Sequence, residues 1–424
     1  MFETLNRALQ IKSLRKRIFF VLAMLCVFRF AAHIPVPGIN IEALRDFFAS
    51  NQLLGMLNLL SGGAMSNFSI VALGLAPYIT ASIIMQLLTM VVPYLEELSK
   101  EGSRGREKIN QYTNLATIPL SALQAYGMIR LFTSGHTPLI QGLSGFKMLA
   151  TIITMTAGTM FLVWIGELIT EKRIGNGISL LILAGIVERI PISIQKTILT
   201  FEPSQIFSYI IFVVLAVLTI VGVVYLTEGQ RNLPVSYARR IRGNRMYGGM
   251  DTYLPLRVNP VGMIPIIFAM ALVLFPGLIG QFMARSSTPW VADFGANLAG
   301  LFQNQFIYGI VYFGLVFAFT YFYTSIVFHP DQISENLQRS GAFIPGIRPG
   351  EPTATYLHNV THRILFFGAL GLALIAVLPI ITQKAFNITT FTIGGAAVLI
   401  VVSVILETIR QIKSQIAIYE YEGK

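Results

Sequence analysis

Ten long apolar runs constrain this chain of 424 residues more than any other feature. A helix needs about 20 mainly apolar residues to cross the hydrocarbon core of a bilayer. The runs occupy residues 18–34, 68–92, 115–132, 148–169, 178–194, 206–226, 261–282, 306–328, 364–381 and 391–406. The fifth run is the least regular, because Glu188, Arg189 and Pro191 interrupt it. We therefore predict an all-α polytopic membrane protein with ten transmembrane helices.

Composition excludes a water-soluble globular protein. Hydrophobic types make up 54% of the residues and charged types only 12%, whereas soluble domains carry about 25% charged residues. The first apolar run ends with Arg29, His33 and then Pro35 and not with a small-residue cleavage site, so we expect it to stay in the mature chain. The single cysteine, Cys26, is expected to be a core hydrophobe.

The distribution of Lys and Arg predicts the orientation. With ten spans both termini lie on one side, and that side carries 23 of the 31 basic residues, while the opposite side carries seven. Basic residues accumulate in cytoplasmic loops. The sequence therefore predicts cytoplasmic termini and two long cytoplasmic loops, 227–259 and 329–361.

The segment between the first two runs is neither a span nor an ordinary loop. Residues 53–60 are mostly apolar, and Ser61, Gly62, Gly63 and Ala64 follow. Eight to twelve helical residues, at about 1.5 Å each, are too short to cross a bilayer. A helix on the outer surface and a segment that re-enters a protein-lined cavity are both compatible with this pattern.

Aliphatic residues recur at helical spacing in two of the runs. Leu75, Ile79 and Ile83 share one face of the second run, and Ile178 and Ile182 share one face of the fifth. Such stripes face lipid or pack against other helices in most membrane proteins. Periodicity alone does not make them a pore lining.

Both long loops contain features suited to docking. The first contains the basic cluster Arg239, Arg240 and Arg242, and the second contains Arg348 within a Gly/Pro-rich stretch. Projecting basic residues can bind phosphate-rich RNA or an acidic protein surface. The same charges are explained equally well if they set the orientation of the chain in the membrane and attract anionic lipid.

Signals for catalysis and for cofactors are poor, and we expect no enzyme activity, no cofactor and no metal. The sequence contains no GxxxxGK[ST] phosphate-binding loop. His358 and His362 have the i, i+4 spacing of metal ligands, but no third ligand is close in the sequence. Energy must come from a partner or a gradient.

Several motifs together resemble the SecY family, the central subunits of bacterial protein-conducting channels, over essentially the whole chain. They are Phe28-Arg29 with Ile34-Pro35-Val36-Pro37-Gly38, Ser61-Gly62-Gly63-Ala64, the stretch from Ala72 to Ile83, Gly175-Asn176-Gly177-Ile178-Ser179, Leu254-Pro255-Leu256-Arg257-Val258-Asn259, and the stretch from Gly341 to Glu351.

The resemblance implies two pseudo-symmetric halves, residues 1–194 and 195–424, around an hourglass pore with a lateral opening to lipid. It implies a pore ring, a plug within about residues 55–64, a lateral gate and a docking surface on the two loops. The implied ring residues are Leu75, Ile79, Ile178, Ile182, Ile267 and Ile400; the plug residues are Gly55, Ser61, Gly62, Gly63 and Ala64; the gate residues are Ser82, Gln86 and Pro265; the docking residues are Arg239, Arg240, Arg242 and Arg348.

The implied function is that of a channel subunit that passes unfolded secretory polypeptides across the bacterial plasma membrane and releases transmembrane segments into lipid. Implied partners are the SecE and SecG subunits, the SecA motor, the ribosome, polypeptides bearing signal sequences, membrane lipid and YidC. Two other classes fit the span pattern: a secondary transporter for a small solute and a structural membrane scaffold.

Overall fold

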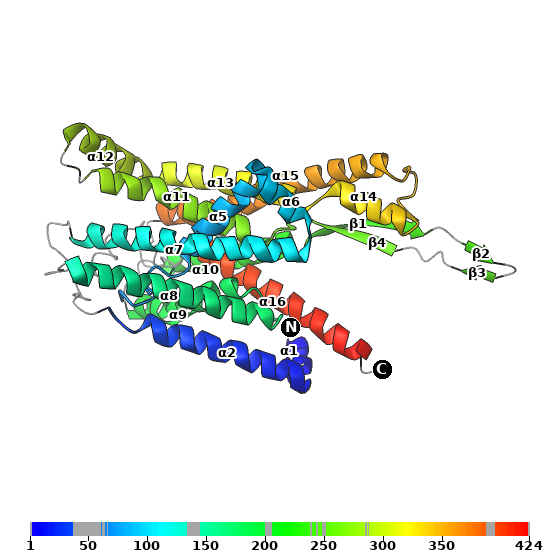
Figure 1. The fold of residues 1–424 in the computed structure, drawn as a ribbon, viewed down its shortest axis with the longest axis horizontal. Coiled ribbons are helices and arrows are strands. Elements are labelled where there is room, and N and C mark those ends of the chain that lie inside the picture. The colour runs from blue at the N-terminus through cyan, green and yellow to red at the C-terminus, as the bar shows by residue number, and fades with distance from the viewer. Residues whose placement is uncertain are drawn as a thin grey trace.

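The computed structural model is a bundle of long helices that lie side by side, with a strand hairpin beyond one end (Figure 1). It describes residues 2–36, 61, 64–65, 67–133, 145–199, 206–237, 240–242, 245–247, 252–284, 286, 288–386 and 395–422. The helices are α1 (Phe2–Gln10), α2 (Lys12–Ala32), α5 (Ala76–Val91), α6 (Pro93–Lys100), α7 (Ser103–Thr133), α8 (Gly145–Glu171), α9 (Gly177–Leu199), α10 (Ile206–Glu228), α11 (Ile264–Met283), α12 (Pro289–Gln303), α13 (Gln305–Val327), α14 (Pro330–Arg339), α15 (Glu351–Phe386) and α16 (Gly395–Glu422).

The helices fit a multi-pass membrane protein, and each of the ten apolar runs overlaps one of them. Five helices in the described part are long and apolar enough to span a membrane, namely α8, α10, α11, α13 and α15. A sixth span is possible if α5 and α6 are counted together, although the chain bends by 100° between them. Helix α2 carries four basic residues in its first six positions, as the entry of a span from an aqueous phase does.

The second run is only partly helical, which corrects the prediction of one continuous span over 68–92. Residues 67–75 form turns, and Ser69 makes an isolated antiparallel bridge with Pro35. Gly74 adopts a left-handed backbone with φ of 56°, and Pro77 stands in the first turn of α5. A proline is tolerated there because the first helical N–H groups have no partner within the helix. Leu75 therefore precedes α5 and does not lie on its surface.

Two helices depart from the sequence prediction. Helix α9 continues through Pro191 to Leu199, which lies beyond the end expected for the fifth run. Helix α12 was not predicted, because its residues 289–303 lie between two apolar runs. It packs against α11 and lies at the end of the bundle opposite to the hairpin (Figure 1).

The described residues of the two long loops pack together and form one strand unit. The strands are β1 (Gln230–Tyr237), β2 (Arg240–Arg242), β3 (Arg245–Tyr247), β4 (Thr252–Arg257) and β5 (Ala342–Phe343). Strand β1 lies between β4 and β5, both antiparallel to it, while β2 and β3 pair with each other. Apolar residues of β1, β4, β5 and the start of α15 form a small core, which includes Leu233, Leu256 and Leu357.

Glycine allows α8 and α9 to approach closely. A side chain on Gly177 would place its Cβ atom 1.9 Å from the carbonyl oxygen of Gly166. A side chain on Gly166 would meet Ile178 Cδ1 at 2.7 Å. Small residues permit such backbone contact between membrane helices. The contact brings the start of α9, and with it Ile178, into the middle of the bundle.

Candidate functional site

Six aliphatic residues that the sequence singles out come together inside the bundle. Leu75, Ile79, Ile182, Ile267 and Ile400 are buried in one apolar cluster, and the half-buried Ile178 packs against it. We call these six residues the aliphatic set. They come from the turn before α5 and from helices α5, α9, α11 and α16, so both halves of the sequence contribute.

The described part of the predicted plug adjoins the aliphatic set. Ser61 and Ala64 are buried, and Ala64 belongs to the same apolar cluster. The Ser61 hydroxyl accepts a hydrogen bond from the Met65 N–H at 3.2 Å, and the Ser69 hydroxyl donates to the Ala64 carbonyl at 3.2 Å. A Cβ atom on Gly74 would lie 2.5 Å from Ser61 Cα, so Ser61 sits against the residue before Leu75. Gly55, Gly62 and Gly63 lie outside the described residues.

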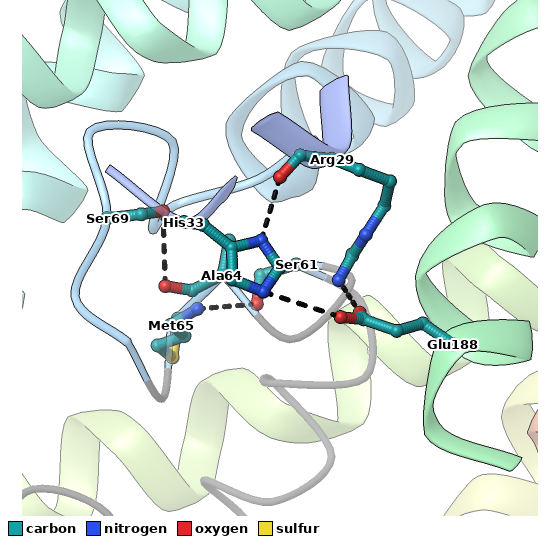
Figure 2. A network of polar contacts seen from close by, with 7 residues as sticks. All are labelled: Arg29, His33, Ser61, Ala64, Met65, Ser69 and Glu188. Atoms are coloured by element: carbon teal, nitrogen blue, oxygen red, sulfur yellow. Dashed lines mark hydrogen bonds and ion pairs between the residues drawn. The ribbon is translucent and has the colours of Figure 1, made fainter. Parts of the chain in front are cut away.

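A charged network borders this segment (Figure 2). Arg29, near the end of α2, forms an ion pair with Glu188 of α9. His33 Nε2 lies 3.7 Å from Glu188 Oε1, and His33 Nδ1 contacts the Arg29 carbonyl oxygen at 2.8 Å. Because that carbonyl can only accept, the contact requires hydrogen on Nδ1. The network links the end of α2 to α9 near Ser61, Ala64 and Ser69, and the sequence did not indicate that these groups would meet.

The predicted gate residues of α5 contact the C-terminal half of the chain. Gln86 Nε2 donates to the Ser82 hydroxyl one turn earlier and to the hydroxyl of Tyr323 on α13, both at 3.2 Å. Gln86 Oε1 is buried and has no hydrogen-bond partner in the described part of the chain. Pro265 is buried in the first turn of α11, and α11 packs against α5.

Aromatic residues that sequence reasoning missed surround this polar contact. The rings of Phe268 and Tyr323 meet edge to face with centroids 5.7 Å apart, and Phe268 also meets Phe319 at 6.1 Å. Edge-to-face pairs are a preferred aromatic geometry. Nothing in the local sequence of Tyr323 distinguishes it from the other aromatic residues of its apolar run, so only the tertiary contact identifies it.

Three of the predicted docking residues, Arg240, Arg242 and Arg348, lie in the part of the two long loops that the structure describes, beyond the bundle. Arg348 is exposed in the turn between β5 and α15, where its carbonyl accepts a hydrogen bond from the Thr353 hydroxyl at 2.8 Å. Arg240 and Arg242 belong to β2 of the projecting hairpin (Figure 1), and Arg239 lies outside the described residues.

Another basic group lies where this unit joins the bundle. Arg410 of α16 forms a 2.7 Å ion pair with Glu228 at the end of α10. Burial, and then repulsion from Arg410, lower the pKa of Arg257, while Glu228 acts in the opposite direction. The guanidinium of an arginine nevertheless stays charged near neutral pH.

Comparison with known proteins identifies the family. The sequence matches the family model described as SecY over residues 69–409. The chain belongs to the SecY family. It is 44% identical to the protein translocase subunit SecY of Corynebacterium glutamicum, with 97% of each chain covered. It is 41% identical to that of Aquifex aeolicus, covering 100% of this chain and 99% of the relative.

Solved structures share the SecY fold at lower identity. One described as a protein conducting channel has a TM-score of 0.61 at 18% identity, covering 93% of this chain and 91% of the other. A SecY structure concerned with the plug domain has a TM-score of 0.65 at 20% identity and the same coverage. Sec61 in a canine ribosome–channel complex has a TM-score of 0.59 at 17% identity, covering 94% and 91%. This SecY-family chain is thus a multi-pass, protein-conducting channel subunit.

Breaking the Arg29–Glu188 ion pair should measurably lower the stability of the protein. Replacing Glu188 with Ala removes the carboxylate from an ion pair whose side chains are 23% and 32% exposed. We expect a loss of about 1–3 kcal/mol, the range for losing a hydrogen bond to a charged group at a sheltered site. Thermal unfolding of the detergent-solubilised protein measures the loss.

The matched control is Glu335→Ala, which breaks an i, i+4 pair with Arg339 whose side chains are 74% and 59% exposed. That change should cost less than about 0.5 kcal/mol. Equal losses in the two variants would show that the Arg29–Glu188 pair adds no more to stability than an exposed surface pair does.

Proposed function

We propose that this chain conducts unfolded polypeptides through the aliphatic set and across the bacterial plasma membrane, with both termini in the cytoplasm. The observation that carries the proposal is one cluster in which five aliphatic residues, from four helices and a turn, are buried and a sixth, Ile178, packs against them. Their burial speaks against the alternative that they face lipid. The 23 basic residues on the side of the termini support the orientation.

A collar of branched aliphatic side chains suits this task physically. Hydrophobic constrictions exclude ions by dewetting. They also offer no fixed hydrogen bonds to a polypeptide that must keep moving. Residues 55–64 would complete the seal, and the close contact of Ser61 with Gly74 supports this role because it anchors one end of the segment beside Leu75.

Crosslinking tests the conduction path. A photoreactive residue at Ile79 or at Ile182 should crosslink to a secretory chain stalled during translocation, because both positions would line the path. The controls are Ile153 on α8 and Ile310 on α13, which are 59% and 57% exposed on the outside of the bundle. Gel electrophoresis of the radiolabelled stalled chain measures the yield.

Crosslinks from all four positions, or from the outer pair alone, would contradict this path. Absence of crosslinks combined with accumulation of a small solute by proteoliposomes would instead support the transporter hypothesis. A scaffold predicts neither result.

We further propose that α5 separates from α11 and α13 to release apolar segments sideways into lipid. Support comes from the Gln86–Tyr323 hydrogen bond, which joins residues 237 positions apart. One such bond contributes only about 1 kcal/mol net, so it can hold a gate shut without locking it. The buried Gln86 Oε1 atom, which has no partner among the described residues, offers an acceptor to an incoming chain.

Tyr323→Phe should make this gate easier to open. The variant removes one hydroxyl and keeps the ring that packs on Phe268. We expect precursors with weakly hydrophobic signal segments to translocate about fivefold more efficiently, as the loss of one hydrogen bond predicts. Initial rates of precursor uptake by membrane vesicles measure the effect.

Tyr225→Phe is the control, because Tyr225 is 80% exposed on α10. It should leave the uptake of weakly hydrophobic precursors unchanged. If Tyr323→Phe and the unaltered protein take up these precursors at equal rates, the Gln86–Tyr323 hydrogen bond does not restrain the gate.

We also propose that the strand unit docks the ribosome and, in alternation, the SecA motor. The solved channels of canine endoplasmic reticulum and of yeast Ssh1 are described in complexes with ribosomes. The exposed Arg348 and the basic hairpin around Arg240 and Arg242 provide charge suited to RNA phosphate. The packing of both loops on one apolar core supports a surface of fixed shape. Partners such as SecE, SecG and YidC belong to the proposal as further members of the assembly.

Arg348→Ala should weaken ribosome binding. We expect about a two- to fivefold higher dissociation constant near physiological salt, because one exposed charge pair with phosphate is lost. The dependence of binding on salt should also become shallower. Co-sedimentation of ribosomes with proteoliposomes measures both quantities.

Arg339→Ala is the control within the same unit, since Arg339 already pairs with Glu335. Equal weakening by both variants would point to general basicity and not to a specific contact of Arg348.

A further inference from the structure

A carboxylate that has no cationic partner among the described residues lies beside the gate helix α5. Glu167 is half-buried near the end of α8. Its Oε1 atom accepts hydrogen bonds from Asn110 Nδ2 at 2.9 Å and from Asn114 Nδ2 at 2.7 Å, both on α7. No Lys, Arg or His in the described part of the chain lies within ion-pair distance of it. Neutral amides thus orient this carboxylate and leave its charge uncompensated.

The same network reaches α5. The Tyr78 hydroxyl donates to Asn110 Oδ1 at 3.3 Å. Tyr78, Ser82 and Gln86 follow one another at i, i+4 and i+8, so they form a polar face of α5 next to the aliphatic face that contains Ile79. This face connects the Glu167 network to the Gln86–Tyr323 contact.

Glu167 also lies close to the aliphatic set. The preceding residue, Gly166, contacts Ile178 at the start of α9. The basic loop that follows α8 contains Lys172 and Arg173, which places Glu167 on the side of the aliphatic set that the charge distribution assigns to the cytoplasm. With this orientation, a chain that enters from the cytoplasm comes to the level of Glu167 before it passes the aliphatic set.

A structural role alone does not explain a charge at this place. Two amide donors satisfy one oxygen of a carboxylate, which can accept about four hydrogen bonds. An ionisable group within a membrane span is costly and is a functional-site candidate for that reason. Asn114 Oδ1, which is buried and has no hydrogen-bond partner in the described residues, adds a second acceptor at the same network.

We propose that Glu167, held by Asn110 and Asn114, binds the Lys or Arg side chain that precedes the apolar core of a signal segment. Signal segments begin with a basic region followed by about 7–15 apolar residues. As a helix these residues extend roughly 10–22 Å, which is no longer than the 16-residue helix α5 at about 1.5 Å per residue. Because Tyr78 stands in the first turn of α5 and bonds to Asn110, a cation fixed at Glu167 would place the start of the apolar residues beside the gate helix. This inference rests on the proposed channel function.

Glu167→Gln tests the charge without removing the hydrogen bonds, because the amide oxygen of Gln can still accept from both Asn side chains. Two precursors are compared that differ only in the basic region, one with two Lys residues and one with Gln in their place. In membranes that contain the assembled translocase, the variant should translocate the basic precursor about two- to fivefold more slowly, the effect of losing one partly exposed charge pair. The neutral precursor should keep its rate.

The control is Glu171→Gln, one turn further along α8, where the side chain is exposed. This variant changes the net charge equally and should leave both rates unaltered. Glu167→Lys adds a second measurement. In this variant, a precursor whose basic residues are replaced by Glu should translocate faster than the original precursor.

Each outcome is distinct. Equal slowing of both precursors by Glu167→Gln would show that the carboxylate is structural, and unchanged rates would show that no cation binds there; either result overturns the proposal. Failure of the unaltered protein to translocate any precursor would instead contradict the proposed channel function.

Discussion

The need to satisfy backbone polar groups inside lipid governs this structure. Helices meet that need by themselves, but the turns of residues 67–75 do not, and such a segment is tolerated at membrane depth only where protein surrounds it. Here α7 and α8 surround it: Phe68 packs edge to face on Phe132, and Gly158 lies so close that a Cβ atom would be 2.0 Å from the Ile70 carbonyl oxygen. The irregular approach to α5 therefore depends on a protein-lined interior that the rest of the bundle provides.

The interior of the bundle contains two kinds of contact. The aliphatic set is held by apolar packing, which has no preferred direction. Directional contacts lie around it, with Arg29–Glu188 beside Ser61 and Ala64 and Gln86–Tyr323 between α5 and α13. This arrangement suits the proposed conduction path, because apolar contacts at the centre would adapt to any side chain while the directional contacts would fix how the helices around it are arranged.

The sequence predicted the helices well, since ten apolar runs of sufficient length leave few other solutions in lipid. It predicted a common face for Ile79 and Ile83 from their spacing, but it could not separate the turns of 67–75 from α5, because those residues are equally apolar. The sequence also could not predict which residues far apart in the chain contact each other. Tyr323 lies 237 positions from Gln86, and β1 pairs with β5 across more than a hundred residues. Such pairings depend on how helices pack, which hydropathy does not encode.

The proposed role of Glu167 depends on the contrast between its negative charge inside the bundle and the basic residues of the predicted cytoplasmic loops. The chain has a net charge of +11, and the predicted topology concentrates its basic residues on one side of the membrane. Basic surfaces attract ribosomal RNA and acidic proteins, but they repel the basic start of a signal segment. A substrate that must pass these surfaces needs an attractive site beyond them, and Glu167 is an acid placed there, one residue from the contact between Gly166 and Ile178. The outer charges would then recruit the partner that delivers the chain, while the inner carboxylate would orient the chain itself.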